Sequence, residues 1–303
     1  MTMMVSILKF HAGGVKGCNL RCCCRWTKWL CLIGCVLLAA YTSKHNSVKG
    51  QDFRILSEIY VQAEALPISQ NLTLFSENLV FDFLLSHEVK PVPQEIVIYD
   101  VRQKLVVLLD PRRSIRTEIS DLQLIKLIEV LSREVTQNET AQFLIKQPFE
   151  EELDLETGKL KLTSPAISYR VQGSQPKDPS LLPRYYEFLD TFSRLAATDP
   201  HKVPPFPRLK LNSAVKRLGW IPDQVSMSVK PNEFFKDPIE ARSKHTLSVG
   251  LTNQDRELIT DAKKNWLRYR VVDLPEYRGL TTNSTTVVTN LPGDRSTIQS
   301  RIK

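Results

Sequence analysis

Hydrophobic and polar residues alternate along most of the chain between residues 54 and 120, which is typical of β-strands with one buried face. Residues 78–85 (NLVFDFLL) place Leu79, Phe81 and Phe83 on one such face. Residues 105–109 (LVVLL) are apolar at every position, so we expect a central strand that is covered on both faces. The gaps between these strands are too short for crossover helices, and the pairing must therefore be antiparallel.

The basic stretch DPRRS at residues 110–114 separates two of these strands. Three arginines in and just after it, Arg112, Arg113 and Arg116, could bind an anionic group. However, Asp-Pro is a strong turn signal, and neither a helix N-terminus nor a glycine-rich loop stands beside it. We interpret the stretch as a turn with solvated arginines at its rim.

A helix is predicted to begin at Asp121, because Ser120 and Gln123 have the spacing of a capping box. Helical periodicity continues to residue 135, and we expect this helix 121–135 to lie against the concave face of the sheet. The residues expected at that contact are Leu124, Ile125, Ile128 and Leu131. Further helices are expected at residues 138–146, 178–197, 213–218 and 253–267, with strands at 224–229 and 246–252.

Residues 150–163 predict a hairpin with a two-residue loop at Thr157 and Gly158. In that register Asp154 faces Lys161, and Leu155 faces Leu160. The acidic residues of this segment alternate along a strand, which favours a solvated face over a calcium site, because calcium ligands converge from a tight turn. They are Glu150, Glu152, Asp154 and Glu156.

Together these patterns predict an α+β protein with a curved antiparallel sheet, similar to an unclosed barrel, with helices packed on one face. Residues 51–172 would hold the sheet and the helix at 121–135, and residues 173–279 would continue the same domain with helices and strands. Residues 280–303 are rich in Ser, Thr and Asn and are expected to be a disordered tail.

The formal net charge of +8 is concentrated at the N-terminus. Residues 1–50 contain no Asp or Glu and seven basic residues, which leaves a net charge of +1 for the remaining chain. A nearly neutral body argues against a nucleic-acid partner. The basic residues are Lys9, Lys16, Arg21, Arg25, Lys28, Lys44 and Lys49.

Residues 1–28 form this basic head, and residues 29–42 (WLCLIGCVLLAAYT) follow it without a charge. This order is typical of a signal anchor or a cleaved signal peptide and places the head in the cytoplasm. The run is shorter than the ~20 residues of an ordinary membrane span. Three alternatives stay open: an uncleaved anchor, a cleaved signal, and a lipoprotein signal cleaved at residues 32–35 (LIGC). We expect a single-pass inner-membrane protein with its C-terminal part in the periplasm, or a secreted protein if the signal is cleaved.

All six cysteines lie between residues 18 and 35, so the exported part has neither a disulfide framework nor a thiol nucleophile. The triplet Cys22–Cys24 could bind metal or be acylated, although its spacing matches no zinc site. The four histidines of the exported part are isolated, and His87 lacks the second histidine of an HExxH motif, because Pro91 occupies that position. We therefore predict no catalytic, cofactor-binding or metal-binding residue and no cofactor.

Two longer stretches carry a resemblance to a known fold. They are YDVRQKLVVLLDPRRSIRTEIS (99–120), which runs into the predicted helix, and FEEELDLETGKLKLTSPAISYRV (149–171). Over residues 54–172 this order of elements resembles exported bacterial proteins whose sheet is similar to the periplasmic lipoprotein-carrier (LolA-like) fold. The resemblance implies an unclosed barrel, helices on its concave side and an apolar cavity for acyl chains. The basic head and residues 178–303 depart from a soluble carrier.

The expected function is a membrane-anchored or exported envelope protein that acts as a non-catalytic scaffold or interaction module. One alternative is the binding of a hydrophobic ligand or a lipoprotein acyl chain in the concave cavity of the sheet. A second alternative is a hydrolase without a recognisable motif. The expected partners are the inner membrane, through residues 29–42, and a hydrophobic ligand or an envelope protein.

Overall fold

A computed structural model describes most of the chain after residue 49, and residues 49–303 form one compact unit. The basic head, the apolar run at 29–42, the predicted helix at 138–146 and nearly all of the predicted tail lie outside the described residues. No helix among the described residues is long and apolar enough to cross a bilayer. The described ranges are 50–85, 93–137, 148–199, 205–231 and 237–280.

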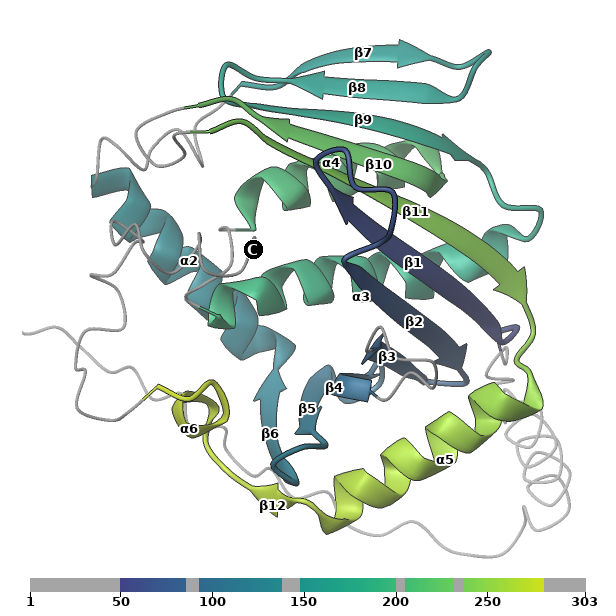
Figure 1. Cartoon of the computed structure of the whole chain (residues 1–303), viewed down its shortest axis with the longest axis vertical. Helices are drawn as coiled ribbons and strands as arrows, with labels where there is room; N and C mark the ends of the chain where they lie inside the picture. Colours follow the sequence, from purple (N-terminus) through teal and green to yellow (C-terminus); the bar gives the residue numbers. More distant parts are fainter. Residues whose placement is uncertain (1–49, 86–92, 138–147, 200–204, 232–236, 281–303) are drawn as a thin grey trace, which may run out of the picture. The chain divides into compact units, whose positions relative to one another are not determined.

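Twelve strands form a single sheet (Figure 1). Its order is β12-β6-β5-β4-β3-β2-β1-β11-β10-β9-β8-β7, so β12 and β7 are the two edges and the sheet is unclosed. The strands are β1 (Phe53–Val61), β2 (Ser69–Ser76), β3 (Leu79–Leu85), β4 (Pro93–Asp100), β5 (Leu105–Asp110), β6 (Ile115–Ser120), β7 (Glu150–Asp154), β8 (Lys159–Thr163), β9 (Ile167–Ser174), β10 (Ile221–Val229), β11 (Ile239–Val249) and β12 (Arg270–Val271).

The sheet consists of two antiparallel meanders, β1–β6 and β7–β11, joined where β1 pairs with β11. This pairing runs from Phe53 opposite Val249 to Val61 opposite Ala241. The predicted antiparallel pairing is confirmed for every pair except the short edge β12, which is parallel to β6. One α+β unit therefore contains a mostly antiparallel sheet.

Helices cover both faces of the sheet. The inner face, which carries Phe53 and Ile55, lies under a layer formed mainly by α3 and α4, whereas α5 covers β2–β5 on the opposite, outer face (Figure 1). The prediction that the helices pack on one face was therefore wrong for α5. The helices are α2 (Asp121–Gln137), η2 (Pro179–Leu181), α3 (Leu182–Leu195), η3 (Ala196–Thr198), α4 (Phe206–Leu218), α5 (Asn253–Arg268) and α6 (Leu274–Tyr277).

Strand β5 is buried on both faces, as its uninterrupted apolar run predicts. Val106 and Leu108 belong to the inner core with α3 and α4, whereas Val107 and Leu109 belong to the outer core with α5. None of the four side chains is more than 1% exposed. A strand that is covered on both faces has to be apolar at every covered position, and residues 105–109 of β5 are.

The α2 helix begins with the predicted capping box, because the Gln123 amide donates to Ser120 Oγ and the Ser120 amide donates to Gln123 Oε1. Its packing differs from the prediction. Leu124 is fully buried, but Ile125, Ile128 and Leu131 are only partly buried. The helix contacts α3, η3 and the end of β6 rather than lying flat on the sheet, because α3 already occupies that face.

Three hairpins use the same four-residue turn, in which an aspartate side chain accepts hydrogen bonds from the turn. Asp110 Oδ1 accepts from the amides of Arg112 and Arg113, which confirms that DPRRS is a turn. Asp100 and Asp154 cap their turns in the same way. The fourth turn residue has a positive φ in each: Lys104, Ser114 and Gly158.

This turn corrects the predicted hairpin register. Because Asp154 caps a four-residue loop, it faces Lys159, and Glu152 faces Lys161. The pairing is shifted by two residues from the prediction, so every side chain keeps its predicted face. Leu155 moves into the turn, where it is 71% exposed. Two of the acidic residues make contacts within the hairpin. Glu152 forms an ion pair with Lys161 at 2.8 Å, and Asp154 caps the turn.

Helix α4 begins seven residues before the predicted helix. Pro207 lies in the first turn of this helix, where the missing amide of proline is not needed. The helix ends as expected at Gly219, which has a φ of +67°. The predicted helix at 253–267 is confirmed as α5, and the helix at 178–197 as α3 with a short 3-10 turn at each end.

The shared turn predicts opposite effects of two glycine substitutions at equivalent positions. Ser114→Gly should raise the free energy of unfolding by about 0.5–1 kcal/mol, because glycine adopts a positive φ without strain. Gly158→Ala should lower it by about 1–2 kcal/mol, because the residue is left-handed. In addition, an added Cβ would meet the Gly173 carbonyl oxygen at 2.6 Å. Urea unfolding of residues 49–303 measures both, and equal signs would contradict this description of the turns.

Candidate functional site

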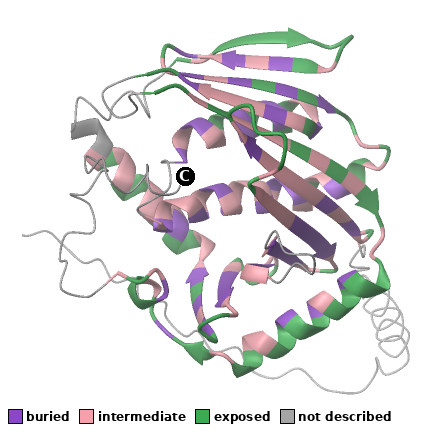
Figure 2. Cartoon of the chain, in the orientation of Figure 1, coloured by how far each residue is buried: buried purple, intermediate pink, exposed green. Residues whose placement is uncertain are grey.

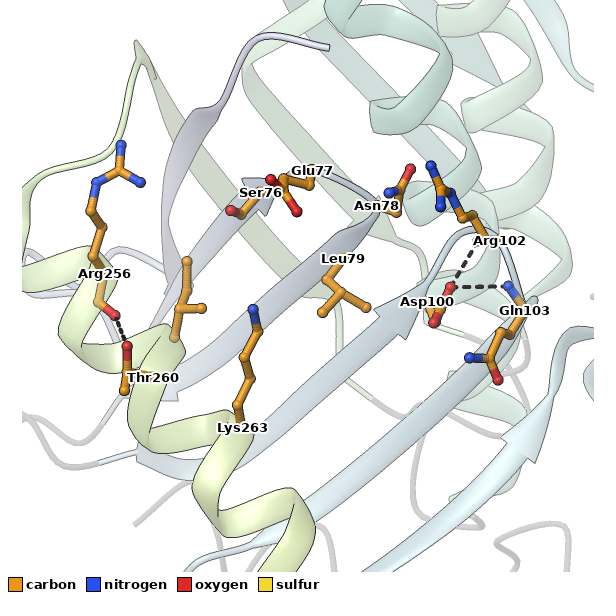
Figure 3. Close-up of a pocket in the computed structure, with 11 residues that line it drawn as sticks. Ser76, Glu77, Asn78, Leu79, Asp100, Arg102, Gln103, Arg256, Thr260 and Lys263 are labelled. Atoms are coloured by element: carbon orange, nitrogen blue, oxygen red, sulfur yellow. Dashed lines mark hydrogen bonds between the residues drawn. The ribbon is translucent and has the colours of Figure 1, made fainter. Parts of the chain in front are cut away.

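A groove of about 620 Å³ lies beside α5 on the outer side of the sheet (Figure 3). Three segments far apart in the sequence form it: the β2–β3 turn, the β4–β5 turn and one side of α5. We call it the α5 groove. Its lining residues are Ser76, Glu77, Asn78, Leu79, Asp100, Arg102, Gln103, Arg256, Ile259, Thr260 and Lys263.

The position of α5 is fixed by a buried ion pair at its N-terminus. Thr252 and Asp255 form a capping box, and the Asp255 side chain is 2% exposed. Arg54 on the outer face of β1 donates to Asp255 Oδ2 at 3.0 Å. Ile259 and Ala262 then pack onto the outer core. An unpaired Asp255 would be costly at this depth, so Arg54 and the cap together hold α5 beside the two turns.

The α5 groove contains three cationic side chains. Lys263 rises from α5 beside Leu79, and its Nζ lies 5.9 Å from the centre of the Phe81 ring (Figure 3). Arg256 lies 3.8 Å from Asp52, a long ion pair with an exposed guanidinium. The structure shows no carboxylate partner for Lys263 within the described part of the chain, whereas its neighbour Lys264 pairs with Asp261 at 3.0 Å.

Two carboxylates also line the α5 groove, but one of them is held by the backbone. Asp100 Oδ1 accepts hydrogen bonds from the amides of Arg102 and Gln103 at 2.9 and 3.0 Å (Figure 3). The lining therefore carries three cations and two carboxylates. With Leu79 and Ile259 as an apolar floor, it suits an anionic group attached to a less polar body.

A second cavity of about 620 Å³ lies between α3 and the β4–β5 turn. Its lining carries three cations and three carboxylates, and four of them form two ion pairs: Lys104 with Glu187, and Arg194 with Asp121 at 3.2 Å. Glu187 also accepts a hydrogen bond from Tyr99, and burial raises the pKa of this tyrosine. Satisfied pairs of this kind stabilise the contact between α3 and the sheet and offer little to a ligand.

His245 is the isolated histidine that the fold brings into a polar cluster. It lies on β11 directly opposite Ser57 of β1, and its Nδ1 is 2.8 Å from Ser57 Oγ. Its Nε2 is 2.9 Å from Ser243 Oγ, so one serine donates to the ring and the other accepts from it. Burial, together with the charge of Arg208, lowers the pKa of His245 to about 4, so the ring is neutral at pH 7.

The polar row continues across the inner face to a buried carboxylate. Ser57 is opposite Asn71, whose side-chain amide donates to Asp82 at 2.7 Å, and Thr73 donates to the same carboxylate at 2.6 Å. A Ser–His pair is the beginning of a nucleophile and base. Among the described residues, however, His245 is bonded by serines and not by a carboxylate, and a pKa of about 4 makes it a weak base at neutral pH.

The arginines of the DPRRS turn and the acidic residues of the 150–163 hairpin do not form a common binding site. Arg113 pairs with Asp110, and Arg116 pairs with Glu118, so both belong to local contacts. No three metal-ligating side chains converge within the described ranges. Sequence reasoning missed the α5 groove, because its cations come from the β4–β5 turn and from one side of α5, and no local motif connects these segments.

Comparisons with known proteins identify no family. No family model matches the chain, and no curated protein matches it. Two solved structures of PNGF-II are similar at 8% and 9% identity, with TM-scores of 0.33 and 0.35. The first match covers 74% of this chain and 31% of PNGF-II, so the chain spans about a third of that protein. The ywiB protein from Bacillus subtilis matches at 6% identity with a TM-score of 0.14, over 66% of this chain and 93% of that protein.

The lowered pKa of His245 predicts an acid-sensitive contribution to stability. Its pKa is about 4 in the folded protein, against an ordinary histidine pKa of 6.5, so the unfolded chain binds more protons between these values. Stability that is present above pH 6.5 should be lost as the pH falls toward 4, by on the order of 3 kcal/mol.

His245→Gln removes this titration and is the matched control. We expect the difference in the free energy of unfolding between wild type and variant, measured in urea at pH 7 and pH 4.5, to shrink at the lower pH. A difference that does not change with pH would mean that the pKa of His245 is not lowered in the folded protein.

Proposed function

We propose that the protein is a membrane-tethered, non-catalytic interaction module of the bacterial envelope that binds an anionic group in the α5 groove. The observation that carries this proposal is the cluster of three cations, Arg102, Arg256 and Lys263, over an apolar floor. The basic head and the apolar run at residues 29–42 support the tether.

A binding function also agrees with the state of the polar groups on the inner face. His245, with its two serine partners, and Asp82, with Asn71 and Thr73, are engaged within the protein. Groups that are satisfied in this way specify strand register and a unique core. Lys263, by contrast, points into a groove without a carboxylate partner among the described residues. An unpaired cation beside an open groove is an ordinary feature of an anion-binding surface.

The resemblance to lipoprotein carriers supports a second candidate, the binding of a hydrophobic ligand on the inner face. The specific observation is a strip along β1 and β11 where the inner face is only partly buried (Figure 2). It combines apolar Ile59 and Ala241 with Ser57, Ser243 and His245. A neutral, partly apolar strip suits an acyl chain whose ester oxygens accept hydrogen bonds. Native mass spectrometry of gently purified residues 49–303 tests it, because a retained lipid would favour this candidate and a ligand-free mass would not.

The α5 groove predicts weak, site-specific binding of inorganic phosphate to residues 49–303. In an NMR titration against sodium chloride at equal ionic strength, the amides of Gln103, Thr260 and Lys263 should shift together. Lys263→Gln should weaken the apparent affinity several-fold, since it removes a charge-assisted hydrogen bond.

Lys264→Gln is the matched control for this titration. It removes the same charge from the next residue of α5, which does not line the groove and already pairs with Asp261. Equal weakening by both variants would indicate a general charge effect, and unchanged binding in Lys263→Gln would remove the basis of the proposal.

A further inference from the structure

The folded unit begins beside the α5 groove. The Asp52 carbonyl oxygen accepts from the Gly250 amide at 2.8 Å, and Asp52 Oδ1 accepts from the amide of Glu77, a groove residue, at 3.3 Å. Asp52 Oδ2 is also the partner of Arg256. The chain therefore leaves the sheet in the N-terminal direction at one margin of this groove.

Strand register places the other parts of the groove at the same end of the sheet. Phe53, the first residue of β1, is paired with Phe75 at the end of β2 and with Val249 at the end of β11. Leu79 at the start of β3 is paired with Asp100 at the end of β4. One end of the sheet thus carries the β2–β3 turn, the β4–β5 turn, the connection from β11 to α5, and the point where the chain enters the fold.

Helix α3 also holds the residues that precede β1. The Arg184 guanidinium donates to the carbonyl oxygens of Gln51 and Glu77, at 2.9 Å for Glu77, and lies over the Phe53 ring. These contacts attach residues 50–52 to the groove end of the sheet. The first described residues of the chain are therefore fixed at this end of the sheet.

The connecting chain is short. Ten residues, 43–52, separate the end of the predicted apolar run from β1. Fully extended, they reach at most about 35 Å. If residues 29–42 anchor the protein in a bilayer, as the proposed function assumes, the end of the sheet that carries the α5 groove stays within that reach of the membrane surface.

We propose that the α5 groove binds the headgroup of an anionic phospholipid in the membrane to which the chain is tethered. Lys263 and Arg256 would contact the phosphate, with Arg102 on the opposite margin. The inference rests on the proposed function and specifies its ligand class.

Tethering explains how an open groove with a modest excess of positive charge can be occupied. A ligand in the same membrane is met at a high effective concentration, so weak intrinsic affinity is enough. An anionic bilayer surface also attracts basic residues that lie within a Debye length of it, and its interaction with them is screened by salt. Binding in this way would orient the folded unit on the membrane.

The test is flotation of residues 49–303 with vesicles. This compact unit contains all of the described core and lacks the predicted membrane segment, so that segment cannot account for any binding. Vesicles of phosphatidylcholine alone are compared with vesicles of equal parts phosphatidylcholine and phosphatidylglycerol. We expect binding to the mixed vesicles only, reduced by added salt, and weakened about fivefold for each groove cation removed.

The paired variants are Lys263→Gln with Arg256→Gln and, as the control, Lys264→Gln with Arg268→Gln. Both remove two charges from α5, but only the first pair lines the groove. Thermal unfolding checks that both fold. Loss of vesicle binding in the first pair alone supports the inference. Equal loss in both pairs, equal binding to neutral vesicles, or no binding to either vesicle at the roughly millimolar lipid concentration that a short tether imposes would overturn it.

The phosphate titration separates this inference from the proposed function. If phosphate shifts the groove amides but the vesicles do not bind, the lipid headgroup is the wrong ligand class, and the anion-binding function stands. If neither phosphate nor the mixed vesicles bind, both the inference and the proposed function fail.

Discussion

The pairing of β1 with β11 is the constraint on which the rest of this structure depends. Nine residues of β1 face nine residues of β11, although almost two hundred residues separate them in the chain. Without this ladder the protein would be two separate meanders, each with an additional unpaired edge. With it, one continuous sheet supports an inner core under α3 and α4 and an outer core under α5.

The positions of the His245 cluster and of the α5 groove both follow from the pairing of β1 with β11. It sets His245 opposite Ser57, and it carries the chain from the end of β11 into α5, whose first turn is held by Arg54 of β1. The α5 groove therefore forms at the end of the sheet where the chain enters. The cations and the apolar floor of the groove lie at this end, which is also where the proposed tether would join the folded unit.

Local sequence patterns predicted much of the fold, because a strand, a helix cap or a turn is determined largely by residues that are close together in the sequence. The apolar run at 105–109, the capping box at Ser120 and the turn at Asp110 act within a few residues, and each was confirmed. The register at Asp154 was wrong by two residues, because the side-chain cap favours a longer loop than glycine alone suggests. The face taken by α5 and the composition of its groove depend on contacts between distant segments, which no local pattern contains.

The most direct test of the central pairing is a disulfide between its two strands. Residues 49–303 contain no cysteine, so Glu58→Cys with Lys244→Cys introduces a single pair at directly opposed outer-face positions. We expect this pair to oxidise in high yield in the folded protein. Glu58→Cys with His245→Cys, on opposite faces, should remain reduced. Failure of the first pair to oxidise, or equal oxidation of both pairs, would contradict the β1–β11 register.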